Sequence, residues 1–349
     1  KPEDYFNVIT WTGNGSSNHA ITGVGFSPEF VWAKCRSNTY QHVLVDIVRG
    51  TDKVLKTDST IAEVSSAGYQ VSFDADGFTT TDNGNLNQGG QTYVAWCWKA
   101  GGSSDTFNVD GTGYSTASAA GLTDGSISLT GASINTTSKF SIVSYTGNST
   151  DGATIPHGLG ATPEFIVIKN RSGGASGSAG GWWSIYHKDL PNKHMYGFNT
   201  GSSTDVTWNN HGFINTVSNT TVTLSQGDNS PAYWWNNDSS ANYIAYCWSG
   251  VEGYSSFGSY AGNGSTDGTF VYTGFRPAWV LIFKTSGGAY WTLMDEKRPG
   301  YNNINYTLNP DRNATEVTSG GNGSVDFLSN GFKAINADSG VNASGSTYI

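Results

Sequence analysis

The chain has 349 residues, of which only 13% are charged, and 46 are glycines. A charged fraction about half the usual share leaves few lysines and glutamates for exposed helix faces, so it favours turns and short strands. The net charge of −9, without any basic run, excludes the phosphate contacts of a nucleic-acid-binding protein and the polybasic patch that anionic membranes attract. No apolar run is long enough for a membrane-spanning helix, so we expect no membrane insertion.

The first predicted elements are strands. Residues 6–11 alternate with period two, and a glycine-rich turn ends them. Residues 30–34 predict a buried strand entered through Pro28, since proline is tolerated at the first position of a strand. A further strand is expected over residues 43–48, where it runs into a turn. Residues 60–66 carry a slight helical signal.

A hairpin and a closing strand follow. Asp76-Gly77 is typical of a hairpin turn, and Asn330-Gly331 repeats the signal later in the chain. Residues 93–98 and 243–248 share the pattern Tyr-(Val/Ile)-Ala-(Trp/Tyr)-Cys-Trp, which predicts a strand that closes each unit. A third copy breaks off at Ile349, so we expect a truncated last strand and a chain that is part of a longer polypeptide.

Three stretches of the chain are versions of one another, and their period of about 100 residues is too long for a solenoid turn. We therefore expect tandem domains at residues 1–102, 140–253 and 254–349. A Gly/Ser/Thr-rich segment at 103–139 is either a linker or a short extra hairpin around residues 127–129, and we expect an ordered but peripheral connector. About six or seven short strands in each unit predict an all-β fold of three tandem antiparallel β-sandwiches, of the jelly-roll or lectin-like type.

The cysteines and acidic turns give no sign of a metal or cofactor. Cys97 and Cys247 take the same place in two repeats and should lie far apart, so we interpret them as core residues rather than a disulfide. No His/Cys spacing suggests zinc, and no cofactor is expected. The strings at 74–77 and 82–87 resemble calcium loops but lack the closing glutamate. Turn chemistry explains both strings, so no metal site is predicted.

Paired acidic and basic residues are the tempting catalytic groups. Asp46 and Asp295 are each followed three residues later by an arginine, Arg49 or Arg298, while His187 takes the same slot in the second repeat. A residue that recurs at one position of separate domains is more economically a turn cap or an ion pair. No nucleophile elbow is present and no two carboxylates are paired as a glycosidase requires, so we expect no enzyme.

The aromatic residues suggest a binding surface, because 12 tryptophans and 18 tyrosines exceed what small sandwich cores need. Trp183 and Trp291 share a slot and are expected in a core or an interface. An exposed tryptophan beside amides suits a sugar ring, whereas a subunit interface is the competing interpretation. The candidate ligand-binding residues are Trp234, Trp235, Asn236 and Asn237, in a segment expected only in the second repeat, together with His187.

Several motifs carry a family resemblance: Tyr-Thr-Gly-Asn at 145–148, Gly-Phe-x-Pro at 25–28 and 274–277, Asp-Gly-Phe at 76–78, and Tyr-Val-Ala-Trp at 93–96. With them the chain resembles tandem domains in structural proteins of marine tailed bacteriophages, of the tail fibre or virion appendage type. The turn at 157–160 is also similar to phage fibre tips and H-type lectin domains. The resemblance covers nearly the whole chain outside 103–139. It implies extracellular β-sandwich domains on a virion, often in symmetric oligomers, without an enzyme motif.

The expected function is that of a non-enzymatic virion structural protein, a fibre or appendage that attaches to host-surface glycans by many weak contacts. Its expected partners are other virion proteins and further copies of itself, with a homotrimer favoured. One alternative is a capsid-surface decoration or scaffold protein that binds only other virion proteins. A secreted glycan-degrading enzyme is the other, and two converging carboxylates in a pocket would support it.

Overall fold

The computed structural model describes residues 1–69, 71–172, 181–190, 195–196, 198, 214–224, 235–318, 321 and 323–349. Strands are the main regular structure of these residues, and the helical residues among them belong to 3₁₀ turns, namely η1 (Pro2–Asp4), η2 (Ala67–Tyr69) and Trp235. The predicted all-β class is thereby confirmed. The helical signal at 60–66 is wrong, because β6 (Val64–Ser65) lies there and pairs with β5 (Lys53–Val54).

The first repeat forms two main antiparallel sheets besides the two-stranded sheet of β5 and β6. The larger sheet has the order β1-β9-β3-β4, and the smaller sheet has the order β2-β8-β7. The turn between β7 and β8 confirms the hairpin predicted at Asp76-Gly77, and Gly77 takes a φ of 139° that favours glycine. The strands are β1 (Phe6–Thr12), β2 (His19–Thr22), β3 (Phe30–Cys35), β4 (Val43–Asp46), β7 (Val71–Asp74), β8 (Gly77–Thr80) and β9 (Thr92–Trp98).

The second repeat has the same two sheets, with the larger one extended. Its larger sheet has the order β11-β10-β12-β13-β20-β15-β16-β17, and its smaller sheet has the order β14-β19-β18. The strands are β10 (Phe107–Val109), β11 (Thr112–Tyr114), β12 (Leu129–Asn135), β13 (Phe140–Thr146), β14 (Thr154–Pro156), β15 (Phe165–Asn170), β16 (Trp183–His187), β17 (Met195–Tyr196), β18 (Ile214–Val217), β19 (Thr221–Leu224) and β20 (Asn242–Trp248).

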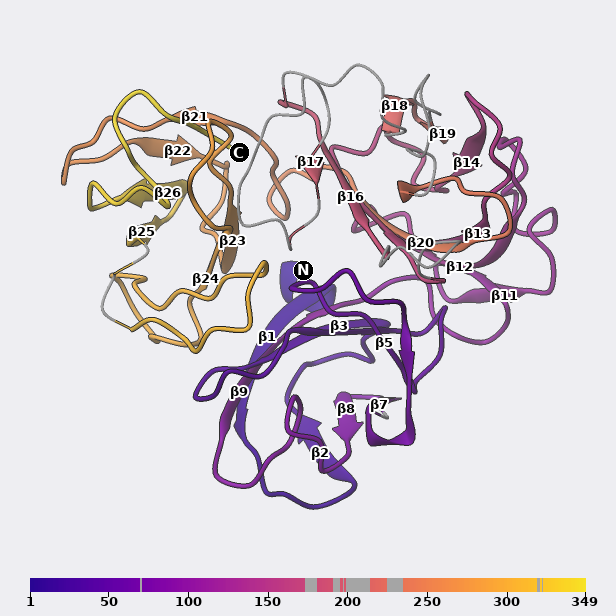
Figure 1. The fold of residues 1–349 in the computed structure, drawn as a ribbon, viewed down its shortest axis with the longest axis horizontal. Helices are drawn as coiled ribbons and strands as arrows, with labels where there is room; N and C mark the ends of the chain where they lie inside the picture. The colour runs from indigo at the N-terminus through magenta and orange to yellow at the C-terminus, as the bar shows by residue number, and fades with distance from the viewer. Residues whose placement is uncertain are drawn as a thin grey trace.

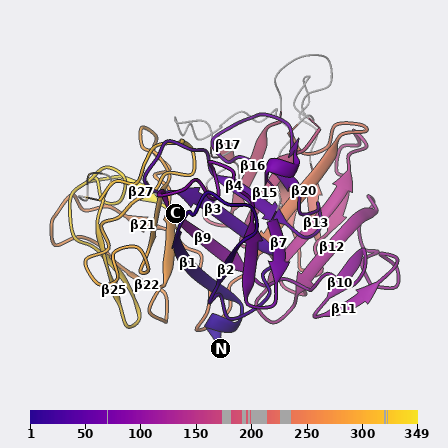
Figure 2. The same ribbon diagram turned by 90° about the horizontal axis from the view of Figure 1, so that it is seen from below.

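The segment at 103–139 supplies the extension of this sheet. β12 pairs with β13 in antiparallel and with β10 in parallel, and Figure 2 shows β10 and β11 at the outer edge. Leu129, Ala132 and Ile134 of β12 are buried in the core of the second repeat. The segment is therefore ordered, as expected, but it belongs to the sheet and is not a peripheral connector.

The third repeat keeps the strand order, but its larger sheet is divided. β21 pairs with β27 and β23 pairs with β24 in two separate sheets, beside a smaller sheet of order β22-β26-β25. The turn between β25 and β26 confirms the hairpin predicted at Asn330-Gly331. The strands are β21 (Tyr260–Ala261), β22 (Phe270–Tyr272), β23 (Trp279–Ile282), β24 (Thr292–Asp295), β25 (Val325–Leu328), β26 (Gly331–Ala334) and β27 (Thr347–Tyr348).

Each repeat has a core of its own between its two sheets. Ile21, Val31 and Phe78 belong to the first of these cores, Ile155 and Ile166 to the second, and Ile282 and Phe332 to the third. Cys97 and Cys247 are free and fully buried, which confirms their interpretation as core residues. This arrangement is that of a β-sandwich. The expected domain boundaries stay a prediction.

A further core joins the three repeats, which lie around a common centre in Figure 1. We call it the shared core. Because the larger sheets are covered on both sides, β3 and β15 are buried along their whole length. A strand buried on both faces can hold few charged side chains, which agrees with the low charged fraction of the chain. Its members include Phe30, Trp32 and Trp96 of the first repeat, Phe140, Trp183 and Tyr246 of the second, and Phe283, Trp291 and Leu293 of the third.

Candidate functional site

An asparagine latch recurs in all three repeats. In each, the Oδ1 of a buried asparagine accepts the backbone N–H of a second asparagine, which lies in the turn after the first strand. The Nδ2 of the buried asparagine donates to the backbone carbonyl of the residue two positions after that second asparagine. The hydroxyl oxygen of the closing-strand tyrosine accepts the N–H of the residue after the latch asparagine. The latch asparagines and their turn partners are Asn87 with Asn14 and Ser16, Asn237 with Asn148 and Thr150, and Asn342 with Asn263 and Ser265.

The latch accounts for part of the predicted ligand site. Trp234 lies outside the described residues. Trp235 is half-buried and stacks on Trp182 with the ring centroids 4.8 Å apart. Asn236 and Asn237 are 0% exposed, so a glycan cannot touch them without rearrangement. The expectation that other repeats lack this segment is wrong for these two residues, because Leu86-Asn87 and Val341-Asn342 occupy the same positions.

His187 is also inside the protein, with 5% of its surface exposed. Burial lowers the pKa of His187 to about 4, so the ring is neutral at pH 7. Its Nδ1 accepts the backbone N–H of Asp189 at 3.1 Å. His187 ends β16 at the place that Asp46 takes in β4 and Asp295 takes in β24.

The acid–arginine pair of the first repeat binds the second repeat. Arg49 Nε donates to Asp46 Oδ2 at 2.5 Å, and Arg49 Nη1 donates to Glu63 at 3.1 Å. The second repeat completes this network, since Tyr246 Oη donates to Asp46 Oδ2 at 2.7 Å and Arg171 pairs with Glu63 at 2.8 Å. Burial alone would lower the pKa of Arg49, but the carboxylates raise it, so the arginine stays charged. The interpretation as an ion pair is confirmed.

The same network joins the third repeat to the first. Arg298 Nε donates to Asp295 Oδ2 at 2.6 Å, and Arg298 Nη1 donates to Glu316 at 2.9 Å. Trp96 Nε1 of the first repeat donates to Asp295 Oδ2 at 3.0 Å, and Arg36 pairs with Glu316 at 2.8 Å. Trp96 thus takes the role of Tyr246. The sequence analysis missed both donors, although their shared place in the closing-strand pattern marks them.

The contact between the second and third repeats lacks these groups. His187 stands in place of the aspartate and Leu190 in place of the arginine. On the third repeat, Thr285 replaces the partner arginine, because its N–H bonds Thr347 O as that of Arg36 bonds Thr92 O. An apolar cleft of about 810 Å³ lies here. We call it the central cleft.

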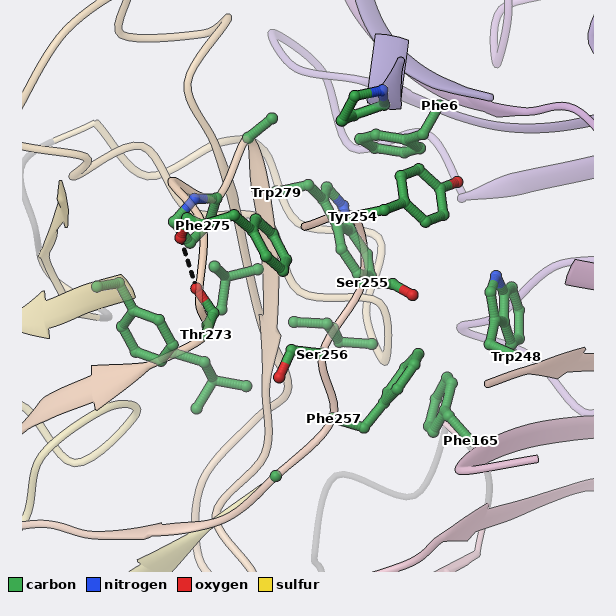
Figure 3. A pocket seen from close by; sticks show the side chains of 18 of the residues that line it. Phe6, Phe165, Trp248, Tyr254, Ser255, Ser256, Phe257, Thr273, Phe275 and Trp279 are labelled. Atoms are coloured by element: carbon green, nitrogen blue, oxygen red, sulfur yellow. Dashed lines mark hydrogen bonds between the residues drawn. The ribbon is translucent and has the colours of Figure 1, made fainter. Parts of the chain in front are cut away.

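All three repeats contribute aromatic walls to the central cleft. Figure 3 shows Phe257 beside Phe165, and their rings stack with centroids 6.1 Å apart. Among the charged residues of its lining, Arg276 pairs with Glu296 at 3.4 Å. The cleft therefore offers a mainly apolar surface. Its aromatic residues include Phe6 and Trp98 of the first repeat, Phe165 and Trp248 of the second, and Phe257 and Trp279 of the third.

A family model described as a domain of unknown function, DUF7483, matches residues 1–349. The chain belongs to this family. Searches of curated proteins and of solved structures found no match.

Five buried or half-buried carboxylates and lysines with shifted pKa values lie outside the central cleft. Burial raises the pKa of Glu29 and of Asp311 to about 7 and that of Asp58 to about 6. Burial also lowers the pKa of Lys34 to about 8 and that of Lys169 to about 7. These five residues are absent from the lining of the cleft. The ammonium groups of both lysines donate to backbone carbonyls, so these buried donors have hydrogen-bond partners within the protein.

Two carboxylates do come near each other, since the charge of Asp58 contributes to the raised pKa of Asp311. They lie where the first and third repeats meet, beside the hydrogen bond from Thr57 Oγ1 to Pro310 O of 2.6 Å. Asp311 is only 8% exposed. Asp311 is therefore almost closed to a substrate, whereas a glycosidase needs both of its carboxyls in reach of one.

Among the described residues, no group of three or more His, Cys, Asp or Glu side chains could hold a metal ion. The carboxylates of the string at 74–77 serve the turns, because Asp76 accepts the N–H groups of Gly23 and Gly25 and Asp74 accepts the hydroxyl of Thr79. A search of the same residues for a helix long and apolar enough to cross a membrane found none.

Proposed function

We propose that the chain is a non-enzymatic structural protein of a virion, a tail fibre or appendage at the virion surface that attaches to host glycans by multivalent weak binding. The observation that carries this proposal is the use of the buried charged groups. Asp46, Arg49 and Glu63, and their counterparts Asp295, Arg298 and Glu316, hold repeats together and leave no carboxylate of the two networks open to a substrate. Such networks suit a rigid scaffold.

Exposed aromatic rings provide the attachment surface in this proposal. Tyr272 is 70% exposed and Tyr301 is 78% exposed, both in the third repeat, and Phe270 lies two residues before Tyr272 on the edge strand β22. Residues two apart on a strand face the same side, so Phe270 and Tyr272 form one aromatic surface on which a sugar ring can stack. Trp235, stacked on Trp182, is the candidate surface in the second repeat.

Weak sites become effective through multiplicity. A site of about millimolar affinity holds firmly when several copies act together, so the proposed protein works as an oligomer on the virion. A homotrimer stays the favoured prediction. The repeats of one chain already lie around a common centre, which gives each molecule several surfaces to present (Figure 1).

Glycan-array and host-cell binding of the purified chain tests the proposal. Tyr272→Ala and Trp235→Ala are compared with Ile61→Ala, which removes an exposed aliphatic side chain and so controls for lost apolar surface. We expect saturable binding that falls about tenfold in one of the aromatic variants and stays unchanged in the control, because stacking contributes about 0.5–1.5 kcal/mol beyond the area that it buries. A folded chain that binds neither glycans nor host cells would contradict attachment.

One observation favours the alternative of a decoration or scaffold protein that binds other virion proteins. The central cleft is apolar and is bordered by strand edges, a surface better matched to polypeptide than to sugar. A chain that binds purified virions or virion proteins, and no glycan, would support this second function.

A further inference from the structure

Two aspartates take the same place in the first and third repeats. Leu55 forms a bridge to β4, and Leu308 forms the equivalent bridge to β24. The third residue after each of these leucines is an aspartate, Asp58 in one repeat and Asp311 in the other. The glutamates of the two networks between repeats follow five residues later in both copies. Asp58 and Asp311 are therefore counterparts in the repeat.

These two counterparts lie near each other where the first and third repeats meet. The residue before Asp58 is Thr57, which is fully buried and donates its hydroxyl to the carbonyl oxygen of Pro310 at 2.6 Å. Pro310 in turn directly precedes Asp311. The carboxylates are close enough that the charge of Asp58 contributes to the raised pKa of Asp311. The contact between the two repeats thus brings together two groups of like charge.

Each carboxylate has one oxygen atom without a hydrogen-bond partner. Oδ1 of Asp58 and Oδ1 of Asp311 are both buried, and neither accepts a hydrogen bond. The whole of Asp311 is only 8% exposed. Buried acceptors of this kind are uncommon, because a polar atom that is removed from water and left unpaired costs free energy. Two of them on neighbouring carboxylates point to a ligand that both oxygens bind.

The basic residues whose charges act on the pair are bound to other groups. Lys34 Nζ donates to a backbone carbonyl oxygen at 2.6 Å, and Lys56 Nζ donates to Gln41 Oε1 at 2.7 Å. The guanidinium carbon of Arg312 lies 4.1 Å from the ring centroid of Tyr290. Burial therefore remains the largest influence on both carboxyls and raises the pKa of each.

The second repeat shows that the fold does not require an acid at this place. Ile185 takes the place of Leu44 and pairs with Met195 of β17. The third residue after Met195 is Phe198, which is buried in the shared core. An apolar side chain can thus fill this place without the cost of a buried carboxylate. Packing alone does not explain the two acids.

We propose that Asp58 and Asp311 together bind one divalent cation of the calcium type, which joins the first repeat to the third. Two carboxylates match its double charge, and Ca²⁺ combines carboxylate ligands with backbone carbonyl oxygens and water in a flexible geometry. Asp58 is half-buried, so a small ion can reach the pair from its side, whereas a sugar cannot enter. The site goes beyond the proposed function and does not depend on glycan binding.

Calcium titration of residues 1–349 at pH 8, after treatment with a chelator, tests the site by calorimetry and by thermal unfolding. The pH lies above the pKa of both carboxyls, about 6 for Asp58 and about 7 for Asp311. Asp58→Asn and Asp311→Asn keep the shape of each side chain and remove its charge. The matched control is Asp124→Asn, which removes one negative charge from an exposed position.

We expect one calcium ion for each parent chain, and a rise of about 2–4 °C in the unfolding temperature at about 10 mM calcium chloride. The control should respond as the parent does, whereas the affinity should fall at least about tenfold in both site variants. Sodium chloride of equal ionic strength should not reproduce the rise, because screening is not binding. A folded parent chain that binds no calcium, or a site variant that binds as tightly as the parent, would overturn the proposal.

Discussion

At the scale of single residues, buried polar groups of this chain differ in whether they have partners. Asp46 and Asp295 are surrounded by donors, whereas Oδ1 of Asp311 has no hydrogen-bond partner. Burial raises the pKa of Asp311 to about 7. Its folded-state pKa lies above the unfolded value, so its contribution to stability is complete at low pH and is lost as pH rises through about 7.

Asp311→Asn should therefore change the pH dependence of stability. We expect the variant to be more stable than the parent chain at pH 8, by about 2 kcal/mol, because no charge is buried there. At pH 5 the two should differ by less than about 1 kcal/mol. Urea unfolding at both pH values measures the difference. The exposed Asp124→Asn provides the control, and a parent-to-variant difference that is the same at both pH values would contradict the argument.

The residue before Cys35 is Lys34, and the equivalent position holds Lys169 in the second repeat but Phe283 in the third. Lys169 Nζ lies 5.0 Å from the ring centroid of Trp183, and in the third repeat Phe283 stacks on Trp291 with centroids 4.4 Å apart. The sequence motif aligns Lys284 with Lys34 and Lys169. The pairing instead aligns Lys284 with Cys35, because Lys284 bridges to Tyr348 as Cys35 pairs with Tyr93. The third copy is therefore one residue longer before its lysine, as counting from Pro277 to Lys284 also shows.

At the scale of elements, the closing strands β9 and β20 connect the repeats. Each pairs along both edges within its own sheet and sends one donor into the next repeat, Trp96 to Asp295 and Tyr246 to Asp46. Because β9 and β20 are central strands, these donors are placed by rigid backbone. The aspartates accept them at the ends of β24 and β4.

Variants at the contact of the first and second repeats should separate the ion pair from the added donor. Asp46→Ala leaves Arg49 charged and buried beside Glu63 alone, so we expect a loss of about 3–5 kcal/mol in the free energy of unfolding. Tyr246→Phe removes one hydrogen bond to a carboxylate and should cost about 1–3 kcal/mol. Denaturant unfolding measures both, and a larger loss in Tyr246→Phe would contradict this ranking.

Much of the element pattern could be predicted because its signals are local. Alternation at 6–11, the apolar run at 30–34 and the turns at Asp76-Gly77 and Asn330-Gly331 all give the structures expected of them. The strand β12 was anticipated only as one alternative, a short hairpin around residues 127–129, since serine and glycine dilute its apolar alternation. The helical signal at 60–66 fails because pairing with β5 decides that segment.

The candidate site was less predictable, because contacts between repeats determine it. Asn237 was interpreted as part of an insertion, yet it precedes Tyr243 by the same interval as Asn87 precedes Tyr93, a match that counting back from the closing strand would have found. His187 lies beside Phe257 of the third repeat, with the ring centroids 6.5 Å apart. Nothing in a single repeat could indicate that distant surface.

At the scale of the whole molecule, the shared core makes the repeats depend on one another. The ring of Phe30 contacts Trp98 of its own repeat and Phe140 of the second, and Phe198 contacts Trp32 and Trp291 of the first and third. No larger sheet is covered by its own repeat alone. Unfolding one repeat would expose apolar surface of the other two.

Thermal unfolding should therefore be a single transition. We expect far-UV circular dichroism and tryptophan fluorescence to give coincident curves. Phe30→Ala, in the shared core, should lower the midpoint of the whole transition, at a cost of about 3–5 kcal/mol. Phe78→Ala, in the core of the first repeat, is the matched comparison and should also shift one common transition. Three separate transitions would show that the repeats unfold independently.

The networks between repeats also have a direction. The second repeat donates a hydroxyl to the first, and the first donates an indole N–H to the third, so the first repeat has both a donating side and an accepting side. Contacts of this head-to-tail kind run in one rotational sense around the centre. Substitution of Asp46 therefore weakens the contact of the first repeat with the second, and substitution of Trp96 weakens its contact with the third, although both residues belong to the same sheet. The two contacts that these networks stabilise can therefore be weakened one at a time.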